Sequence, residues 1–259
     1  MDISSASNPK IKRLMALRDR RQRDRERVFL VEGIRELERA VAAGLRPLEI
    51  YYDPTRFPGP PVPAEVELSV APEGMDRASY RRRSQGVIAV FARFEMELSH
   101  LVIPPSPLFL LAEAIEKPGN LGALLRTADA VGAAGLIVTD TGADPLNPNV
   151  IRSSTGTLFS VPIAVTTLDR AITWLREHDI SIHAADPGAT DLLWSLDLTG
   201  PCALIAGSEH HGLSDRARSA ADSLVRIPME GDADSLNVSV SMAILAYEAL
   251  RQRRTSRMN

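Results

Sequence analysis

The stretch that decides the fold reads IPMEGDADSLNVSVSMAILAYE and runs from Ile227 to Glu248. It overlaps the end of a β-like run over 223–229. The Gly- and Asp-rich residues that follow, 230–235, favour neither a strand nor a helix. From Val238 onward apolar residues recur with helical spacing, and a Ser or Asn directly before such a run is typical of a helix N-cap. The pattern predicts a strand, a polar loop and a helix, which is where α/β folds bind ligands. It also fits an ordinary, well-capped connection.

The rest of the chain alternates strand-like and helix-like segments, which indicates the α/β class. Strands are predicted at 28–32, 48–52, 66–70, 86–91, 108–112, 136–139, 161–165, 180–185, 203–207 and 223–229. Helices are predicted at 11–21, 34–43, 75–82, 120–131, 148–155, 168–177 and 213–221, and from 238 onward.

The alternation lapses around the proline-rich residues 104–107, which predicts a division of the chain. A smaller α/β domain is expected at 1–95, a linker at 96–106 and a larger domain at 107–259. The larger domain's strands are continuous apolar runs, typical of a mostly parallel sheet with helices on both faces.

Composition excludes several classes of protein. The single cysteine, Cys202, rules out an internal disulfide framework and a multi-cysteine metal site, and the five histidines show no metal-ligand spacing. No metal is therefore expected. No apolar stretch is long enough for a membrane span, and the first residues do not read as a signal peptide, so the expected location is cytoplasmic.

Basic residues gather in clusters although the net charge is −3. Nine basic residues and three acidic ones lie between Lys10 and Arg27, and further arginines lie at 81–83 and 251–257. Clustered guanidinium groups match phosphate well, so an RNA or DNA partner is predicted. The residues expected to contact it are Arg20, Arg21, Arg23, Arg81 and Arg82. The alternative for the first cluster is a solvated helix face with i,i+4 ion pairs.

Three loops at strand ends carry unusual polar content. They lie at 116–122, 207–214 and 231–237, and the first leads into a helix that carries Arg126. No G-x-G-x-x-G follows a strand, and neither a P-loop nor a nucleophile elbow occurs. Any chemistry therefore rests on Arg, Asn, Ser, Glu and backbone donors, which position and polarise a substrate rather than form a covalent intermediate.

These three loops resemble, in order and spacing, the three motifs of the SpoU/TrmH-type RNA ribose methyltransferases of the SPOUT superfamily. The matching stretches are NLGALLRTA (120–128), IAGSEHHGL (205–213) and IPM (227–229) with SLNVSV (235–240). Ser208 departs from the pattern, since many members carry Asn there. The N-terminal part is similar to the family's substrate-binding domain, itself like a small ribosomal RNA-binding protein, through FLVEG (29–33) and GVIA (86–89).

The resemblance implies a deep trefoil knot in the larger domain, a homodimer with the site near the subunit interface, and S-adenosyl-L-methionine as methyl donor. Residues implied to hold the donor are Ile205, Ala206, Gly207, Ile227, Met229 and Leu236. The implied acceptor is a ribose 2′-hydroxyl. Ribosomal RNA is preferred because a separate RNA-binding domain is present. A tRNA 2′-O-methyltransferase and a catalytically silent RNA-binding protein are the alternatives.

The resemblance also implies a catalytic set. Arg126 would bind the phosphate beside the target ribose and polarise the hydroxyl, because a guanidinium is a poor base. Asn120 and Glu209 would orient Arg126 or the ribose, and Ser235 and Asn237 would brace the active-site loop.

Overall fold

The computed structural model describes residues 2–5, 7–81, 83–140, 142–208, 210–232 and 234–256. The chain forms two compact units. The first unit consists of Met1–Glu95 with Asp144–Ser160, and the second of Met96–Ala143 with Val161–Asn259. The chain therefore passes from one unit to the other three times.

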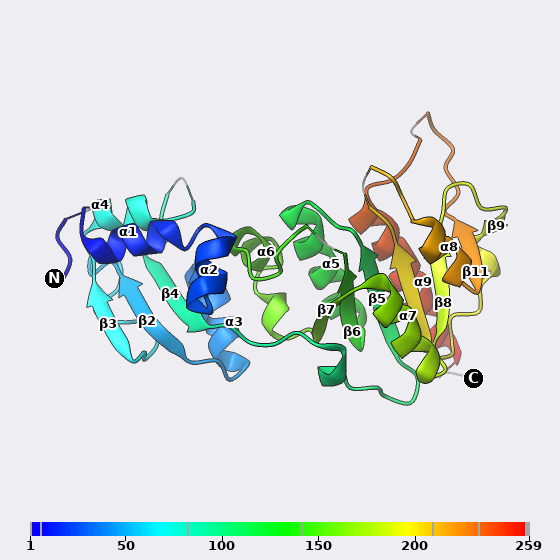
Figure 1. The fold of residues 1–259 in the computed structure, drawn as a ribbon, viewed down its shortest axis with the longest axis horizontal. Helices are drawn as coiled ribbons and strands as arrows, with labels where there is room; N and C mark the ends of the chain where they lie inside the picture. The colour runs from blue at the N-terminus through cyan, green and yellow to red at the C-terminus, as the bar shows by residue number, and fades with distance from the viewer. Residues whose placement is uncertain are drawn as a thin grey trace. The chain divides into compact units, whose positions relative to one another are not determined.

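The first unit is built on a mixed four-stranded sheet of order β1-β4-β2-β3, of which β4, β2 and β3 are labelled in Figure 1. β4 pairs antiparallel with both β1 and β2, and β3 pairs parallel with β2. Its strands are β1 (Val28–Glu32), β2 (Pro47–Tyr52), β3 (Val66–Ser69) and β4 (Val87–Ala92). Its helices are α1 (Pro9–Ala16), α2 (Arg20–Glu26), α3 (Ile34–Ala42), α4 (Pro72–Ala78), α6 (Pro148–Ser153) and the 3-10 turn η2 (Thr157–Phe159).

The helix predicted over 11–21 is wrong in its extent, because the chain forms two helices there. α1 ends at Ala16, and Asp19 caps α2 by accepting a hydrogen bond from the backbone N–H of Arg21 at 2.8 Å. An aspartate that bonds a nearby backbone N–H competes with a continuous helix. The turn between the helices therefore follows from Asp19.

The segment 144–160 belongs to the core of the first unit. The Asp144 carboxylate accepts a hydrogen bond from the Arg23 guanidinium at 2.6 Å, and both side chains are almost fully buried. Phe159 stacks on Phe29 with ring centroids 6.0 Å apart, and Arg39 donates to the carbonyl of Thr155 at 2.8 Å. These contacts join the segment to α2, α3 and β1.

Arg23 is buried, which corrects its assignment to RNA contacts. Besides Asp144, its guanidinium donates to the carbonyls of Leu17 and Arg18, at 3.0 and 2.7 Å. A buried cation with these partners is not available to a phosphate in solvent. Arg23 therefore stabilises the first unit.

The second unit contains a seven-stranded parallel sheet of order β7-β6-β5-β10-β8-β11-β9. Its strands are β5 (Leu108–Glu113), β6 (Gly135–Thr139), β7 (Ile163–Thr166), β8 (Ser181–Ala185), β9 (Asp191–Leu192), β10 (Cys202–Ala206) and β11 (Ser223–Arg226). Its helices are α5 (Pro118–Val131), α7 (Leu168–Glu177), α8 (Asp215–Ala220), α9 (Val238–Ser256) and the 3-10 turns η1 (Leu98–His100) and η3 (Leu193–Ser195).

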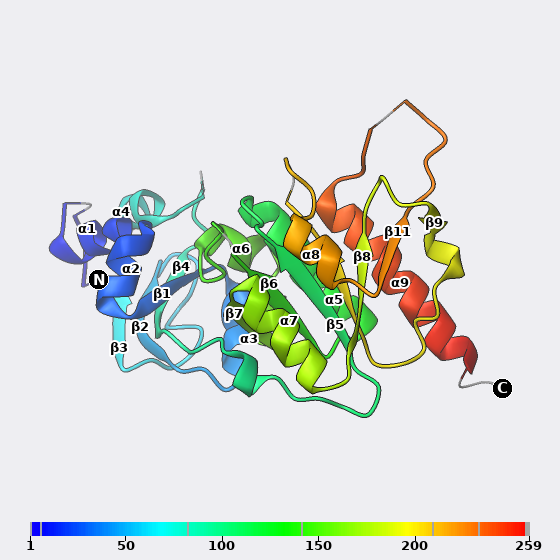
Figure 2. The ribbon, with the colours of Figure 1, turned by 45° about the vertical axis from the view of Figure 1, so that its right-hand side comes forward.

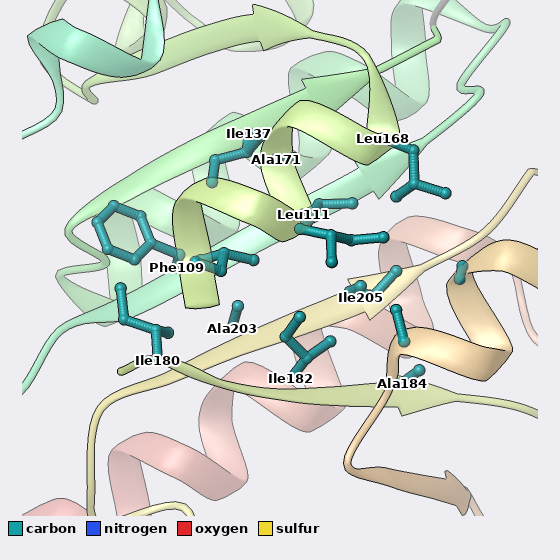
Figure 3. Close-up of a cluster of buried hydrophobic side chains, with 14 of the residues drawn as sticks. Phe109, Leu111, Ile137, Leu168, Ala171, Ile180, Ile182, Ala184, Ala203 and Ile205 are labelled. Carbon is teal, nitrogen blue, oxygen red and sulfur yellow. The ribbon is translucent and has the colours of Figure 1, made fainter. Parts of the chain in front are cut away.

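Helices cover both faces of this sheet. α7 and α8 lie on one face, and α5 and α9 pack side by side on the other (Figure 2). Alternate residues of the central strands face α7 and α8, including Phe109, Leu111, Ala203 and Ile205 (Figure 3). Both faces are thus apolar, which explains the uninterrupted apolar runs in the sequence.

The predicted α/β class, the mostly parallel sheet and the smaller N-terminal unit are confirmed. The short β9 and the three 3-10 turns were not predicted. The segment 96–106, expected as a linker, packs on the second unit through buried Leu98 and Leu101. The knot and the domain boundaries stay predictions. Within the described ranges, no helix combines the length and the apolar content that crossing a membrane requires.

We expect Asp144→Asn to lower the free energy of unfolding by about 3–5 kcal/mol, because it leaves the buried Arg23 charge without its partner. Urea denaturation would measure the loss. The control is Glu95→Gln, which breaks the exposed Arg27–Glu95 pair and should cost about 0–1 kcal/mol. Equal effects of the two substitutions would contradict the structural role of the buried pair.

Candidate active site

A cavity of about 560 Å³ lies in the second unit, where the strand ends of β8, β10 and β11 meet the start of α9. Parallel strands bring their carboxyl ends to one edge of the sheet, so loops far apart in sequence line the same space. The lining residues are Lys117, Ala185, Asp186, Pro187, Ala206, Gly207, Ser208, His210, His211, Gly212, Arg218, Val225, Ile227, Met229, Ser235, Leu236, Asn237, Val238 and Ser241.

The loop after β10 turns back tightly on the end of its strand. Ser208 and Gly212 exchange backbone hydrogen bonds of 2.9 and 3.1 Å. A Cβ atom on Gly207 would lie 2.1 Å from the carbonyl oxygen of Gly212, well inside any real contact. Only glycine allows this approach. Gly207 therefore presents bare backbone to the cavity, which Ser208, His210 and His211 of the same loop also line.

A buried carboxylate holds the far end of this loop. Glu113, the last residue of β5, is buried and accepts a hydrogen bond from the backbone N–H of Ser214 at 3.0 Å. The Ser214 hydroxyl in turn accepts the N–H of Ala217 at 3.1 Å and caps α8. Both bonds fix where the loop ends and the helix begins.

An ion pair on the cavity wall joins the loop after β8 to α8. The Asp186 carboxylate is 5% exposed; it pairs with the Arg218 guanidinium and accepts the N–H of Gly188 at 2.8 Å. Arg218 also donates to the carbonyl of Leu213 at 3.4 Å. The pair neutralises a buried charge and ties two of the lining loops together.

The first and third loops meet at a pair of asparagines. The Asn237 amide donates to the Asn120 side-chain oxygen at 3.2 Å. Asn237 also accepts from the backbone N–H and the hydroxyl of Ser239, at 3.0 and 2.6 Å. The predicted N-cap before α9 is confirmed. Two residues of the expected catalytic set thus lie in contact although 117 positions separate them.

The cavity gathers most of the residues expected to hold the methyl donor. Ala206, Gly207, Ile227, Met229 and Leu236 line it. Ile205 does not, because it lies fully buried in β10 on the face toward α7 and α8 (Figure 3).

The expected catalytic residues are only partly gathered there. Ser235 and Asn237 line the cavity, and Asn120 lies beside Asn237. Arg126 is exposed on α5, outside the lining, and has no hydrogen bond or ion pair in the described part of the chain. Glu209 lies outside the described residues.

The arginines expected to contact RNA differ in their surroundings. Arg20 and Arg21 are exposed on α2, and Arg20 lies 3.5 Å from Asp24. Arg81 is mostly buried and lies 3.7 Å from Glu36 and 3.9 Å from Glu32. Arg82 lies outside the described residues.

Seven polar residues of the wall were not predicted as site residues: Lys117, Asp186, Ser208, His210, His211, Arg218 and Ser241. Four of them, Lys117, Ser208, His210 and His211, lie in the polar loops that the sequence indicated at 116–122 and 207–214. A signal for Asp186 was present, since it directly follows the strand predicted at 180–185 and precedes Pro187-Gly188, a turn signal. No signal points to Arg218, because its role depends on its contact with Asp186.

Two families match the two parts of the sequence. Residues 107–247 match the SpoU rRNA Methylase family, and residues 8–89 match the MRM3-like substrate binding domain. A 23S rRNA (uridine(2479)-2′-O)-methyltransferase of Streptomyces viridochromogenes is 32% identical over 255 residues, which cover 93% of this chain and 88% of that protein. The 23S rRNA (guanosine-2′-O-)-methyltransferase RlmB of Bordetella pertussis is 37% identical over 190 residues, 71% of this chain and 77% of that one.

Solved structures agree over nearly the whole chain. The crystal structure of an RNA 2′-O ribose methyltransferase superposes with a TM-score of 0.87 at 41% identity, covering 98% of this chain and 100% of that one. The SpoU methyltransferase AviRb from Streptomyces viridochromogenes, in complex with AdoMet, has a TM-score of 0.86 at 30% identity, with 96% and 99% covered.

We expect Gly207→Ala to weaken S-adenosylmethionine binding by about tenfold or more, because displacing packed backbone costs about 1–3 kcal/mol. Isothermal titration calorimetry would measure the affinity. Gly200→Ala is the matched control, since a Cβ at Gly200 meets no atom within 4 Å. Undiminished binding by Gly207→Ala would show that the close approach does not shape the donor site.

Proposed function

We propose that this chain, which belongs to the SpoU rRNA methylase family, transfers a methyl group from S-adenosylmethionine to a ribose 2′-hydroxyl of ribosomal RNA. The observation that carries the proposal is the cavity onto which the three motif loops converge, joined by the Asn120–Asn237 contact. A methyl donor beside groups that position an RNA hydroxyl is what this reaction requires.

The cavity fits S-adenosylmethionine in size and in chemistry. Its volume of about 560 Å³ lies in the range of cofactor sites. Gly207 offers bare backbone to polar groups, while Ile227 and Leu236 supply apolar walls. These residues and Met229 would hold the donor. When bound, it supplies an electrophilic methyl group on a positively charged sulfur.

The chain's own residues then have to position the acceptor and help to remove its proton. Arg126 is exposed and unpaired within the described residues, so it can bind a phosphate next to the target ribose. Its charge would polarise the 2′-hydroxyl as the oxygen–carbon bond forms and the carbon–sulfur bond breaks. The proton would leave to that phosphate or to water, since a guanidinium is a poor base.

The other catalytic residues would support this geometry. The Asn120–Asn237 pair holds the start of α5 against the loop before α9, and Ser235 lies in that loop. Glu209 would orient Arg126 or the ribose. A site held by contacts between loops is rigid enough to favour in-line transfer.

The RNA would bind the first unit through Arg20, Arg21 and Arg81, and through Arg82 as the sequence predicts. Ribosomal RNA is favoured over tRNA because the Streptomyces relative, which matches 93% of this chain, is named a 23S rRNA methyltransferase. A silent RNA-binding protein is less favoured, because it would have no need of the braced cavity.

The proposal includes a homodimer and the trefoil knot of the family. Val240 and Tyr247 of α9 are 46% and 53% exposed and lie two helical turns apart on one side, which supports an apolar interface. The expected cytoplasmic location suits an enzyme that acts on ribosomal RNA. The proposed chemistry uses no metal.

We expect Arg126→Ala to lower the rate of methyl transfer by about 100-fold or more while donor binding stays unchanged, because a group that polarises the hydroxyl is lost. Transfer of tritiated methyl to a 23S rRNA transcript, with calorimetry of donor binding, would measure both. Arg170→Ala, at an exposed position of α7, should keep the wild-type rate. A wild-type rate for Arg126→Ala would refute its catalytic role.

We expect the double substitution Arg20→Gln, Arg21→Gln to weaken RNA binding and to flatten its dependence on salt. Each phosphate that the protein no longer neutralises should reduce the slope of log K against log salt by about 0.7–0.9. Filter binding at several salt concentrations would measure this slope. Arg46→Gln, at an exposed position outside the arginine clusters, is the control, and an unchanged slope in the double variant would exclude phosphate contacts there.

A further inference from the structure

Tyr80 is an exposed aromatic residue within the most arginine-rich loop of the first unit. It follows α4 and is 36% exposed, whereas Tyr51 in the sheet of the same unit is fully buried. Arginines precede and follow it at 77, 81 and 83, and those at 77 and 83 are exposed. A large ring in such a place is not explained by packing of the core.

The backbone under this ring is held by a buried carboxylate. The Tyr80 N–H donates to Glu32 Oε2 at 2.7 Å, and the Ser79 hydroxyl donates to the other Glu32 oxygen. Glu32 is only 8% exposed and belongs to β1, a strand whose five residues are all buried. The backbone that carries the ring is therefore held in place by hydrogen bonds, although it lies in a loop.

A guanidinium lies against the Tyr80 ring. The Arg18 carbon Cζ is 6.0 Å from the ring centroid, a cation–π distance. Arg18 donates to the carbonyl of Arg77 at 2.6 Å and to that of Ser79. In the part of the chain that the structure describes, Arg18 bonds to these carbonyls and forms no ion pair with a carboxylate, so no anion offsets the positive charge that it holds against the ring.

We propose that Tyr80, supported by Arg18, is a stacking platform for one unpaired base of the RNA substrate, with Arg77 and Arg83 at the flanking phosphates. Single-stranded RNA is recognised by aromatic rings and guanidinium planes that stack on exposed bases, next to cations that bind the backbone. A paired base has no free face to offer. The inference rests on the proposed function for its choice of RNA.

Two substitutions test whether the Tyr80 ring binds RNA: Tyr80→Ala removes the ring, and Tyr80→Phe keeps it. Tyr80→Ala should weaken binding to a 20-nucleotide oligouridylate by about 5- to 100-fold, the range for one stacked base, while Tyr80→Phe keeps the affinity within about twofold. The salt slope should not change, because no charge is removed. Trp194→Ala, at an aromatic residue 56% exposed in the second unit, should have no effect.

Binding of a fully paired RNA duplex of the same length distinguishes a loss of base stacking from a loss of the protein's fold. Tyr80→Ala should bind the duplex as the wild type does, and its melting temperature should match that of Tyr80→Phe. Equal binding of oligouridylate by Tyr80→Ala and the wild type would overturn the proposal. Equal loss on oligouridylate and duplex would overturn it as well.

Methyl transfer to a 23S rRNA transcript distinguishes this inference from the proposed function. Tyr80→Ala should raise KM for the transcript and leave kcat unchanged, because the ring binds RNA away from the reacting atoms. A wild-type protein that binds RNA and donor but transfers no methyl would refute the function and leave the platform standing. An active enzyme in which Tyr80→Ala changes neither KM nor affinity would refute the platform alone.

Discussion

The close approach between Gly207 and Gly212 is the constraint on which the cavity depends. β10 lies in the middle of the parallel sheet, between β5 and β8, so the direction of its last residues is set by two neighbouring strands. Any side chain at 207 would have to occupy the place of the Gly212 carbonyl. The loop would then swing away from the strand end, and the cavity would lose the wall that offers backbone donors and acceptors.

The other walls hold their shape through polar contacts between loops rather than through apolar packing. Glu113 reaches from β5 to the start of α8, Asp186 from the loop after β8 to Arg218, and Asn120 from α5 to Asn237. Glu113 and Asp186 are both 5% exposed, so water competes little with their hydrogen bonds. A cavity assembled from four separate loops can thus be ordered before any ligand arrives, which lowers the entropy that binding costs.

The features that could be predicted from sequence are those that a few consecutive residues determine. The strand ends, the polar loops and the N-cap at Asn237 each involve a few neighbouring positions, and α7 begins and ends at its predicted residues. The Arg23–Asp144 pair joins positions 121 apart, and no local pattern shows that Asp144 will enter the first unit. The burial of Arg23 therefore could not be seen, and the same holds for Arg218, whose partner lies 32 positions away.

The arginine-rich N-terminus shows why a count of charges overstates the contacts available to RNA. Of the nine basic residues between Lys10 and Arg27, four pair with carboxylates: Arg13, Arg20, Arg23 and Arg27. The other five, Lys10, Lys12, Arg18, Arg21 and Arg25, have no ion pair among the described residues, and Arg18 is committed to two carbonyls. The basic residues of this segment that are left to bind phosphate therefore carry only a modest positive charge. The chain as a whole has a net charge of −3. Counterion release scales with the phosphates neutralised, so electrostatics alone would hold RNA weakly at physiological salt. Tight and selective binding by this unit therefore requires contacts that do not depend on charge, and these have to come from its exposed uncharged groups.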